Sequence, residues 1–356
     1  MRKSLRARSG HRHYLRIMPA LAVAALFATI VPAAAATQLT GAGSSFDYPF
    51  FSKAFFEYAK SHGDVQVNYQ SIGSGGGIAQ FTQRTVDFGA TDVPMNAAEI
   101  KAAQAGGGPV LQVPVALGGV SIAYNVPGVR SGLRLSRNAL AGIFLGKVVS
   151  WDDPQITKLN PHMKLPKTPI VVVHRADGSG TTYIFSDYLS NISAEWKSKI
   201  GTGKSVTWPA ASAIGGKGNE GVAGQVNNNP GAIGYVELAY ALQNKMTEAT
   251  LENAAGKYVV DSAGTVRAAA ATKPNVSPGN FSIVNSKCAG CYPIAGYSWV
   301  VLYQKPHDAA RGKLLQSIFM WLIGDTAQKM AASLDYVPLP HNVQAAAAKT
   351  LRRMQA

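Results

Sequence analysis

Strand-like and helix-like segments alternate along the chain. The strand-like segments are rich in β-branched residues and include VQVNYQS, VDFGATD and IVVVHRADGSG. The clearest helical pattern lies in SSFDYPFFSKAFFEYAK, where apolar residues recur at helical spacing at Phe46, Phe50, Phe51, Ala54, Phe55 and Tyr58. Strands that alternate with helices predict parallel sheets flanked by helices, so we expect an α/β architecture. The segments 104–109 and 251–290, which are rich in Gly, Ala and Asn, are expected to be loops.

The first 36 residues have the pattern of a secretory signal peptide. Six basic residues precede an apolar run of about fifteen residues, and small residues in VPAAAATQ follow it. The alternative is a membrane anchor, but a span needs about eighteen or more apolar residues and Pro19 interrupts this run. We therefore expect cleavage near Ala36 and a mature protein that is free in an extracytoplasmic compartment.

Length, apolar content and charge limit the possible classes of protein. A chain of 356 residues with 47% apolar and 15% charged residues is expected to form two globular domains. Loss of the six basic residues of the signal peptide lowers the formal charge from +15 to +9, which still favours anionic partners. Nucleic acid is not expected, because the basic residues are spread along the chain without a dense run.

The chain has two cysteines, Cys288 and Cys291, in KCAGCYPIAGYSWVVLY. In an oxidising compartment, a lone pair of cysteines most often forms a disulfide, which is the expectation here. A redox-active pair is expected at a helix N-terminus that follows a strand, whereas here a strand-like segment follows the pair. A free dithiol remains the other alternative.

Three segments share one pattern, in which a strand leads through a turn of glycine and serine into a helix. They are GAGSSF (41–46), SIGSGGG (71–77) and RADGSGTT (175–182). Each turn offers backbone N–H groups and a hydroxyl at the positive end of a helix, where an anion can approach small residues closely. A single turn of this kind usually does no more than cap its helix. Three in one α/β chain predict a common anion site beyond the carboxyl ends of the strands.

The chain shows no catalytic pattern of comparable strength. ADGSGTT lacks the flanking glycines of a hydrolase nucleophile elbow, and GTGKS lacks the first glycine of a P-loop. The seven histidines have no metal-ligand spacing, so neither a metal nor another cofactor is expected. His174 is the one candidate base near the turns, and a polar residue at the rim of the site is the preferred interpretation.

Several motifs together resemble one family. They are LTGAGSSF, NYQSIGSGGG, TVDFGATDVPM, LGKVVSWDDPQITKLNP, HRADGSGTTYIFSDYL, WPAASAIGGKGNEGVAG, PGAIGYVELAYA and SLDYVPLP. Their order and content resemble the periplasmic phosphate-binding proteins of phosphate-specific ABC transporters over nearly all of the mature chain.

The resemblance implies a two-lobed type II periplasmic binding protein fold. Each lobe would be a mixed sheet flanked by helices, and two crossover strands would form a hinge on which the lobes close over the ligand. By analogy, one lobe comprises residues 37–117 with 292–356 and the other comprises 118–291. The implied partners are inorganic phosphate and an inner-membrane permease with its ATPase, and the protein is expected to be a monomer.

The resemblance also implies which positions contact phosphate: Ser45, Phe46 by its backbone N–H, Ser74, Asp92, Arg175, Ser179, Gly180 by its backbone and Thr181. Asp177 matches the family's carboxylate that holds the arginine in place. The chain departs from the family in FDYPFF, which puts Asp47 beside the anion site, and we expect this carboxylate to point outward. His174 and the CAGC insertion are further departures.

Asp92 indicates which anion the site would take. A carboxylate can only accept hydrogen bonds, so it requires a ligand that carries a proton. Phosphate carries one near neutral pH and sulfate does not. We therefore expect a non-catalytic protein that binds phosphate and rejects sulfate. A secreted phosphatase and a binding protein for another oxyanion remain the alternatives.

Overall fold

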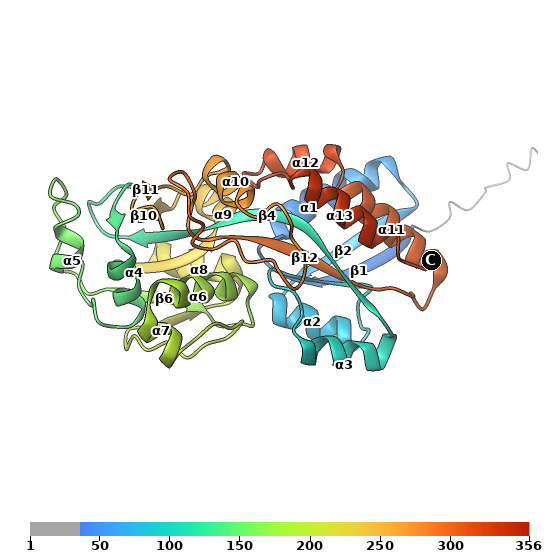
Figure 1. Ribbon diagram of the computed structural model, residues 1–356, viewed down its shortest axis with the longest axis horizontal. Helices are drawn as coiled ribbons and strands as arrows, with labels where there is room; N and C mark the ends of the chain where they lie inside the picture. The colour runs from blue at the N-terminus through green and yellow to red at the C-terminus, as the bar shows by residue number, and fades with distance from the viewer. Residues whose placement is uncertain (1–35, 356) are drawn as a thin grey trace, which may run out of the picture. The chain divides into compact units, whose positions relative to one another are not determined.

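A mixed sheet of nine strands runs through residues 36–355, the part of the chain that the computed structural model describes (Figure 1). Residues 1–35, all but the last residue of the predicted signal peptide, lie outside the described residues. The strand order is β2-β1-β3-β12-β4-β8-β6-β7, and β9 pairs with β4 off this path. These strands are β1 (Thr37–Gly43), β2 (Val65–Ser71), β3 (Phe88–Thr91), β4 (Val110–Asn125), β6 (Val171–Arg175), β7 (Ile214–Gly216), β8 (Ala232–Glu237), β9 (Thr247–Glu248) and β12 (Ala295–Tyr303).

Two long antiparallel strands, β4 and β12, occupy the middle of the sheet. On one side β12 pairs with β3, which belongs to a parallel group with β1 and β2. On the other side Val120–Asn125 of β4 pairs with β8, which belongs to a parallel group with β6 and β7. The predicted α/β fold with a mixed sheet is therefore confirmed, and β4 runs through both groups. The two-lobe division at 117/118 and 291/292 and its hinge stay predictions.

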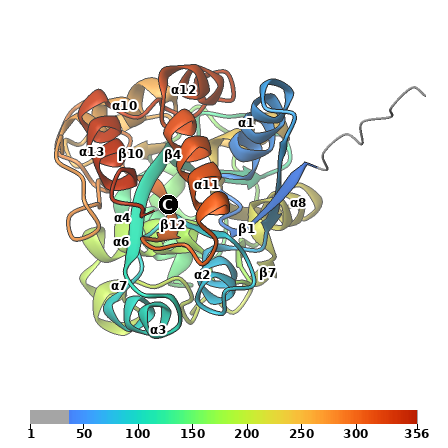
Figure 2. The same ribbon diagram turned by 90° about the vertical axis from the view of Figure 1, so that its right-hand side faces the viewer.

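Helices cover both faces of the strands. Figures 1 and 2 show α11, α12 and α13 on one face of the β1–β3 group, with α2 and α3 on the opposite face. The helices are α1 (Tyr48–Ser61), α2 (Ser74–Thr82), α3 (Ala97–Gly107), α4 (Arg137–Phe144), α5 (Pro154–Thr157), α6 (Gly180–Ile192), α7 (Ala194–Lys199), α8 (Gly218–Asn228), α9 (Leu238–Gln243), α10 (Ala263–Ala271), α11 (Ala309–Leu322), α12 (Asp325–Ala332) and α13 (His341–Leu351). Among residues 36–355, none of these helices has the length and apolar character needed to cross a membrane.

The aromatic face of α1 forms part of the core, as its spacing predicts. Phe50, Phe51 and Phe55 are buried, and the rings of Phe51 and Phe55 lie 5.0 Å apart. The ring of Phe55 also packs edge-on against Phe319 of α11, with centroids 6.4 Å apart. Burial of each such side chain stabilises the fold by about 1.5–3 kcal/mol, so this face fixes α1 on the sheet.

Two predicted loops contain regular structure. The helix α3 continues to Gly107, so the loop expected at 104–109 is wrong for its first four residues. There the ring of Tyr303 approaches so closely that a β-carbon at Gly107 would lie 2.1 Å from it, which explains the glycine. The segment 251–290 contains α10, whose start is stabilised by a capping box between Ser262 and Thr265. It also contributes β10 (Thr250–Glu252) and β11 (Tyr258–Val259) to a small sheet with β5 (Arg134–Leu135).

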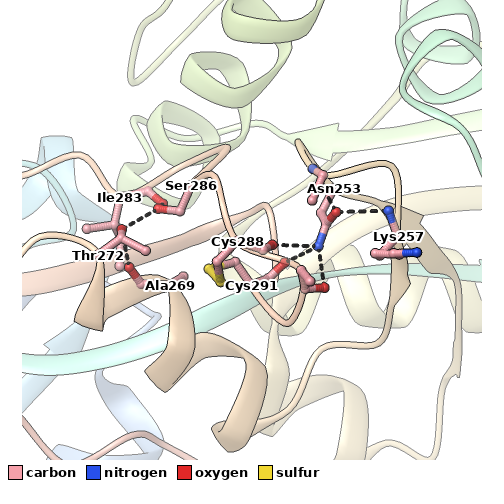
Figure 3. The surroundings of a disulfide bond; sticks show 10 residues. Asn253, Lys257, Ala269, Thr272, Ile283, Ser286, Cys288 and Cys291 are labelled. Carbon is pink, nitrogen blue, oxygen red and sulfur yellow. Dashed lines mark hydrogen bonds between the residues drawn. A yellow bond between two sulfur atoms is a disulfide. The ribbon is translucent and has the colours of Figure 1, made fainter.

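Cys288 and Cys291 form the predicted disulfide, with their Cα atoms 5.2 Å apart (Figure 3). The side-chain amide of Asn253 lies beside this turn. Its Nδ2 donates to the carbonyl oxygens of Cys288, Ala289 and Cys291 at 3.1, 2.9 and 3.1 Å. The turn is thus held by a buried amide as well as by the covalent bond.

Candidate anion-binding site

The three glycine and serine turns meet in one place. The backbone nitrogen of Gly180, at the start of α6, donates to Ser74 Oγ, at the start of α2, at 3.0 Å. The backbone nitrogen of Gly75 donates to the carbonyl of Gly178 at 2.8 Å. The first turn joins the second through Gly43, whose carbonyl accepts from Gly73 N at 2.8 Å. The N-termini of α1, α2 and α6 therefore converge, which is the arrangement that an anion site built from these turns requires.

Arg175, at the end of β6, places its guanidinium group in this region. Its side chain is 1% exposed and forms two parallel hydrogen bonds with Asp177, from Nε to Oδ1 at 2.8 Å and from Nη2 to Oδ2 at 2.5 Å. Asp177 also accepts from Gly218 N at 3.0 Å. Burial alone would raise the pKa of Asp177, but the hydrogen bonds and charge of Arg175 outweigh it and lower the pKa. The guanidinium is therefore fixed, and its Nη1–Nη2 edge is left to face Thr181 Oγ1, 3.3 Å from Nη1.

Asp92 lies directly after β3 with 2% of its surface exposed. Its Oδ1 accepts hydrogen bonds from the hydroxyls of Ser44 and Ser298, the latter at 2.7 Å. Its Oδ2 lies 3.4 Å from Ser74 Oγ. Burial raises the pKa of Asp92 above its ordinary value, and these hydroxyls and the charge of Arg175 offset only part of that rise. Asp92 is thus a buried carboxyl group at the point where two of the turns meet.

The remaining predicted residues lie around the same point. Ser179 caps α6, because its Oγ accepts from Thr182 N at 3.0 Å. Ser45 and Thr181 are fully buried and belong to different turns. Phe46 is buried and its carbonyl accepts from Tyr336 OH at 2.5 Å. The contacts of these side chains with an anion stay a prediction.

Asn219, in the first turn of α8, connects two of the predicted residues and was missed in the sequence analysis. Its backbone nitrogen and its Nδ2 both donate to Ser45 Oγ at 3.0 Å, and Nδ2 also lies 3.4 Å from Thr181 Oγ1. Its Oδ1 accepts from Glu237 N at 2.9 Å, which fixes the orientation of the amide. The motif AIGGKGNEGVAG could have pointed to it, since it places this polar residue at another glycine-rich helix start.

The expectation that Asp47 points outward is wrong. Its side chain is fully buried, and its Oδ2 lies 2.6 Å from Ser298 Oγ, within hydrogen-bonding distance. Burial, together with the nearby charge of Asp92, raises the pKa of Asp47 well above its usual range. The carboxyl group lies inward because Ser298 of β12, 251 positions away in sequence, supplies its hydrogen-bond partner.

His174 is half-buried beside Arg175. Its ring stacks on Trp208 at 5.2 Å, and its Nδ1 lies 2.9 Å from the carbonyl oxygen of Arg175. The ring is therefore fixed by packing. Over the described part of the chain, no three His, Cys, Asp or Glu side chains are grouped closely enough to hold a metal ion.

Comparisons with known proteins agree in the kind of protein they find. Residues 31–322 match the model of the PBP superfamily domain. The chain is 47% identical over 309 residues to the phosphate-binding protein PstS of Xylella fastidiosa, which covers 86% of this chain and 82% of that protein. It is 43% identical over 327 residues to PstS of Pasteurella multocida, which covers 91% and 92%.

Among solved structures, the fold is similar to that of a high-affinity periplasmic phosphate-binding protein bound with phosphate. The TM-score is 0.69 at 22% identity, with 87% of this chain and 92% of the other covered. At this identity the likeness concerns the fold.

Proposed function

The chain belongs to the PstS family of phosphate-binding proteins, and on that basis we propose that it binds inorganic phosphate outside the inner membrane and delivers it to an ABC importer. The single observation that carries the proposal is the convergence of three glycine-rich helix starts on Arg175 and Asp92. A phosphate held there would exchange its hydration shell for backbone N–H groups, serine and threonine hydroxyls and one guanidinium.

This set of groups suits a tetrahedral anion that is removed from water. An unpaired buried charge is very costly, so each oxygen needs a donor. Ser45, Ser74, Ser179 and Thr181 would supply hydroxyls, and Phe46 and Gly180 would supply backbone N–H groups. Arg175 would supply the only full positive charge, through the edge that Asp177 leaves free.

Asp92 would select for a ligand that carries a proton. Its Oδ1 is already hydrogen-bonded to two serine hydroxyls, which leaves Oδ2 on the side of Ser74 and Gly180. An ionised carboxylate can accept a hydrogen bond from HPO₄²⁻ or H₂PO₄⁻, whereas sulfate has no proton to offer. Sites built around such a required bond commonly reject the analogue that lacks it by about 10⁴–10⁵-fold.

Delivery to the importer completes the proposal. The signal peptide would direct the chain to the periplasm with cleavage near Ala36, and the mature monomer would carry phosphate to the permease and its ATPase. The role is non-catalytic. The alternative of a secreted phosphatase predicts turnover of a chromogenic phosphate ester, which we expect to be absent.

Equilibrium dialysis with labelled phosphate and labelled sulfate tests the binding proposal. The wild type should retain phosphate and exclude sulfate, and Asp92→Asn should lose that preference. Asp335→Asn is the matched control, because Asp335 is exposed and its positive φ of 67° suits asparagine equally well. Equal retention of the two anions by the wild type would refute selection by Asp92.

A further inference from the structure

Asp47 occupies the N-cap position of α1 but does not cap the helix. An aspartate there commonly accepts from the backbone N–H two or three residues later. In this chain the Asp47 side chain makes no such bond. It is instead fully buried and directed at Ser298. A local role in the helix therefore does not account for this carboxyl group.

The hydroxyl of Ser298 lies between two carboxyl groups. Its Oγ is 2.6 Å from Asp47 Oδ2 and 2.7 Å from Asp92 Oδ1, with the carbonyl oxygen of Thr91 at 3.3 Å. The register of β12 against β4 shifts between Ser298 and Trp299, an irregularity of the kind that redirects a side chain. A serine hydroxyl has one hydrogen to donate. If both carboxyl groups were ionised, Ser298 would face two acceptors at hydrogen-bonding distance with a proton for only one.

The surroundings favour the proton on Asp47. Asp92 is approached by the hydroxyls of Ser44, Ser74 and Ser298 and by the charge of Arg175, all of which stabilise its ionised form. Asp47 has the one bond to Ser298, and no group among the described residues hydrogen-bonds its buried Oδ1. Where two buried carboxyl groups lie this close, repulsion between like charges raises the pKa of one of them, which then keeps its proton.

The titratable groups that face Asp47 from the surrounding elements are all acidic or phenolic. They are Asp92 after β3, Tyr69 of β2, Glu237 at the end of β8 and Tyr336 before α13. None of these groups can offer a positive charge to an ionised Asp47. The electrostatic surroundings therefore agree with the hydrogen-bond pattern.

We propose that Asp47 is a neutral carboxylic acid that donates its proton to Ser298 Oγ, and that Ser298 in turn donates to Asp92 and keeps Asp92 ionised. Asp47 is thus a positioning residue for phosphate recognition. The inference rests on the proposed function, because it assigns a purpose to the ionised state of Asp92. The expected consequence is that Asp92 stays ionised at mildly acidic pH and can still accept a hydrogen bond from the proton of phosphate.

The direction of the pH effect follows from the donor that Ser298 provides. When Asp47 donates to Ser298 Oγ, the single Ser298 hydrogen is directed at Asp92; without Asp47 the hydroxyl is free to turn to the carbonyl oxygen of Thr91 instead. A hydrogen bond to the charged form of an acid lowers its pKa, so this loss of orientation raises the pKa of Asp92. Binding is lost as pH falls through that pKa. The acidic limb of the binding profile should therefore move to higher pH in Asp47→Ala. The titration of free phosphate is common to all variants, so it cancels in the ratio of their dissociation constants.

The first test measures the proton directly, without phosphate. Infrared difference spectroscopy of the full mature protein in D₂O should show a carbonyl band of a protonated carboxylic acid at neutral pH. The component of this band that belongs to Asp47 should disappear in Asp47→Asn and persist in Asp92→Asn, whereas any component from the buried carboxyl groups of Glu237 and Asp261, whose pKa values burial also raises, should remain in both variants. A spectrum of the wild type without a band that Asp47→Asn removes would overturn the proposal, whether or not the protein binds phosphate.

The second test measures the dissociation constant of phosphate by calorimetry between pH 5 and pH 8. Asp47→Ala should bind about tenfold more weakly than the wild type at pH 5 and within about threefold of it at pH 8, which corresponds to one pKa unit on Asp92. Asp47→Asn should restore the acidic limb, since its amide can donate to Ser298 Oγ. Ser298→Ala should reproduce the shift without adding to it in the double variant.

The outcomes separate the two proposals. If the ratio of the dissociation constants of Asp47→Ala and wild type does not change with pH, the proposed hydrogen-bond chain from Asp47 through Ser298 to Asp92 is wrong, while phosphate binding itself would stand. A wild type that binds no phosphate would refute the proposed function, while the infrared band would still test the protonation of Asp47. If the alanine variant does not fold, Asp47→Asn carries the infrared test alone.

Discussion

Gly180 and Asp92 are in contact so close that no side chain fits between them. A β-carbon at position 180 would lie 2.6 Å from the backbone nitrogen of Asp92 and 2.5 Å from its Cβ. The two residues come from different turns, one at the start of α6 and the other after β3. Glycine at 180 is therefore what allows the two turns to close on each other.

Substitution of this glycine should separate the turns. Gly180→Ala places a methyl group against the Cβ and the backbone nitrogen of Asp92, and overpacking of this kind typically costs about 1–3 kcal/mol. We expect phosphate affinity to fall by more than about tenfold, measured by calorimetry. The control is Gly224→Ala in α8, where a β-carbon meets nothing within 4 Å. This substitution should slightly increase the stability of the helix, because alanine has the higher helix propensity. Equal affinities of the two variants would contradict this account of the site.

Asp177 should link stability to pH. Its pKa in the folded protein is lowered, so its contribution is present above the ordinary aspartate pKa of about 4 and is lost as pH falls through the lowered value. Asp177→Asn should therefore unfold at a lower temperature than the wild type at pH 6, and the difference should shrink towards pH 2.5. Thermal unfolding followed by circular dichroism measures it. A difference that stays constant over this range would argue against the ion pair with Arg175.

Asn219 should affect phosphate affinity indirectly, through its hydrogen bonds to Ser45 and Thr181, without itself contacting the anion. Asn219→Ala removes the amide that orients Ser45 and Thr181, and we expect affinity to fall about tenfold, in keeping with one or two lost hydrogen bonds. Asn219→Asp should be worse, because a carboxylate cannot donate and adds a negative charge. The exposed Asn275 provides the control, Asn275→Ala. Calorimetric titration with phosphate compares the three, and wild-type affinity in Asn219→Ala would contradict the prediction.

Reduction of the disulfide should have a small effect on stability and none on phosphate affinity. On the chain-entropy model, so short a loop contributes only about 2 kcal/mol, and Asn253 holds the turn independently. For a protein of this size we expect the unfolding temperature to fall by about 3 °C in dithiothreitol. The double variant Cys288→Ser/Cys291→Ser should show the same decrease and no response to the reductant. A loss of more than about 10 °C would mean that the bond supports more than its own turn.

Local patterns in the chain predicted the parts of this fold that depend on near neighbours in sequence. The spacing of Phe50, Phe51 and Phe55 identified α1, and the glycine and serine turns identified the starts of α2 and α6. The predictions failed where a distant partner altered the outcome. The glycines at 104–109 suggested a loop, whereas Gly107 belongs to α3 and its missing side chain makes room for the ring of Tyr303, a partner far away in sequence.

The same contrast between local sequence and distant partners applies to the polar groups of the site. The residue types that could surround an anion are evident from the turns themselves, since glycine, serine and a following helix are local features. Whether Asp47 faces water or the interior depends on Ser298, and whether Ser45 has an amide partner depends on Asn219, 174 positions away. Local sequence sets backbone conformation through steric and hydrogen-bonding preferences over a few residues. Only the packing of distant strands and helices decides which buried polar groups meet, and therefore which of them carries the proton.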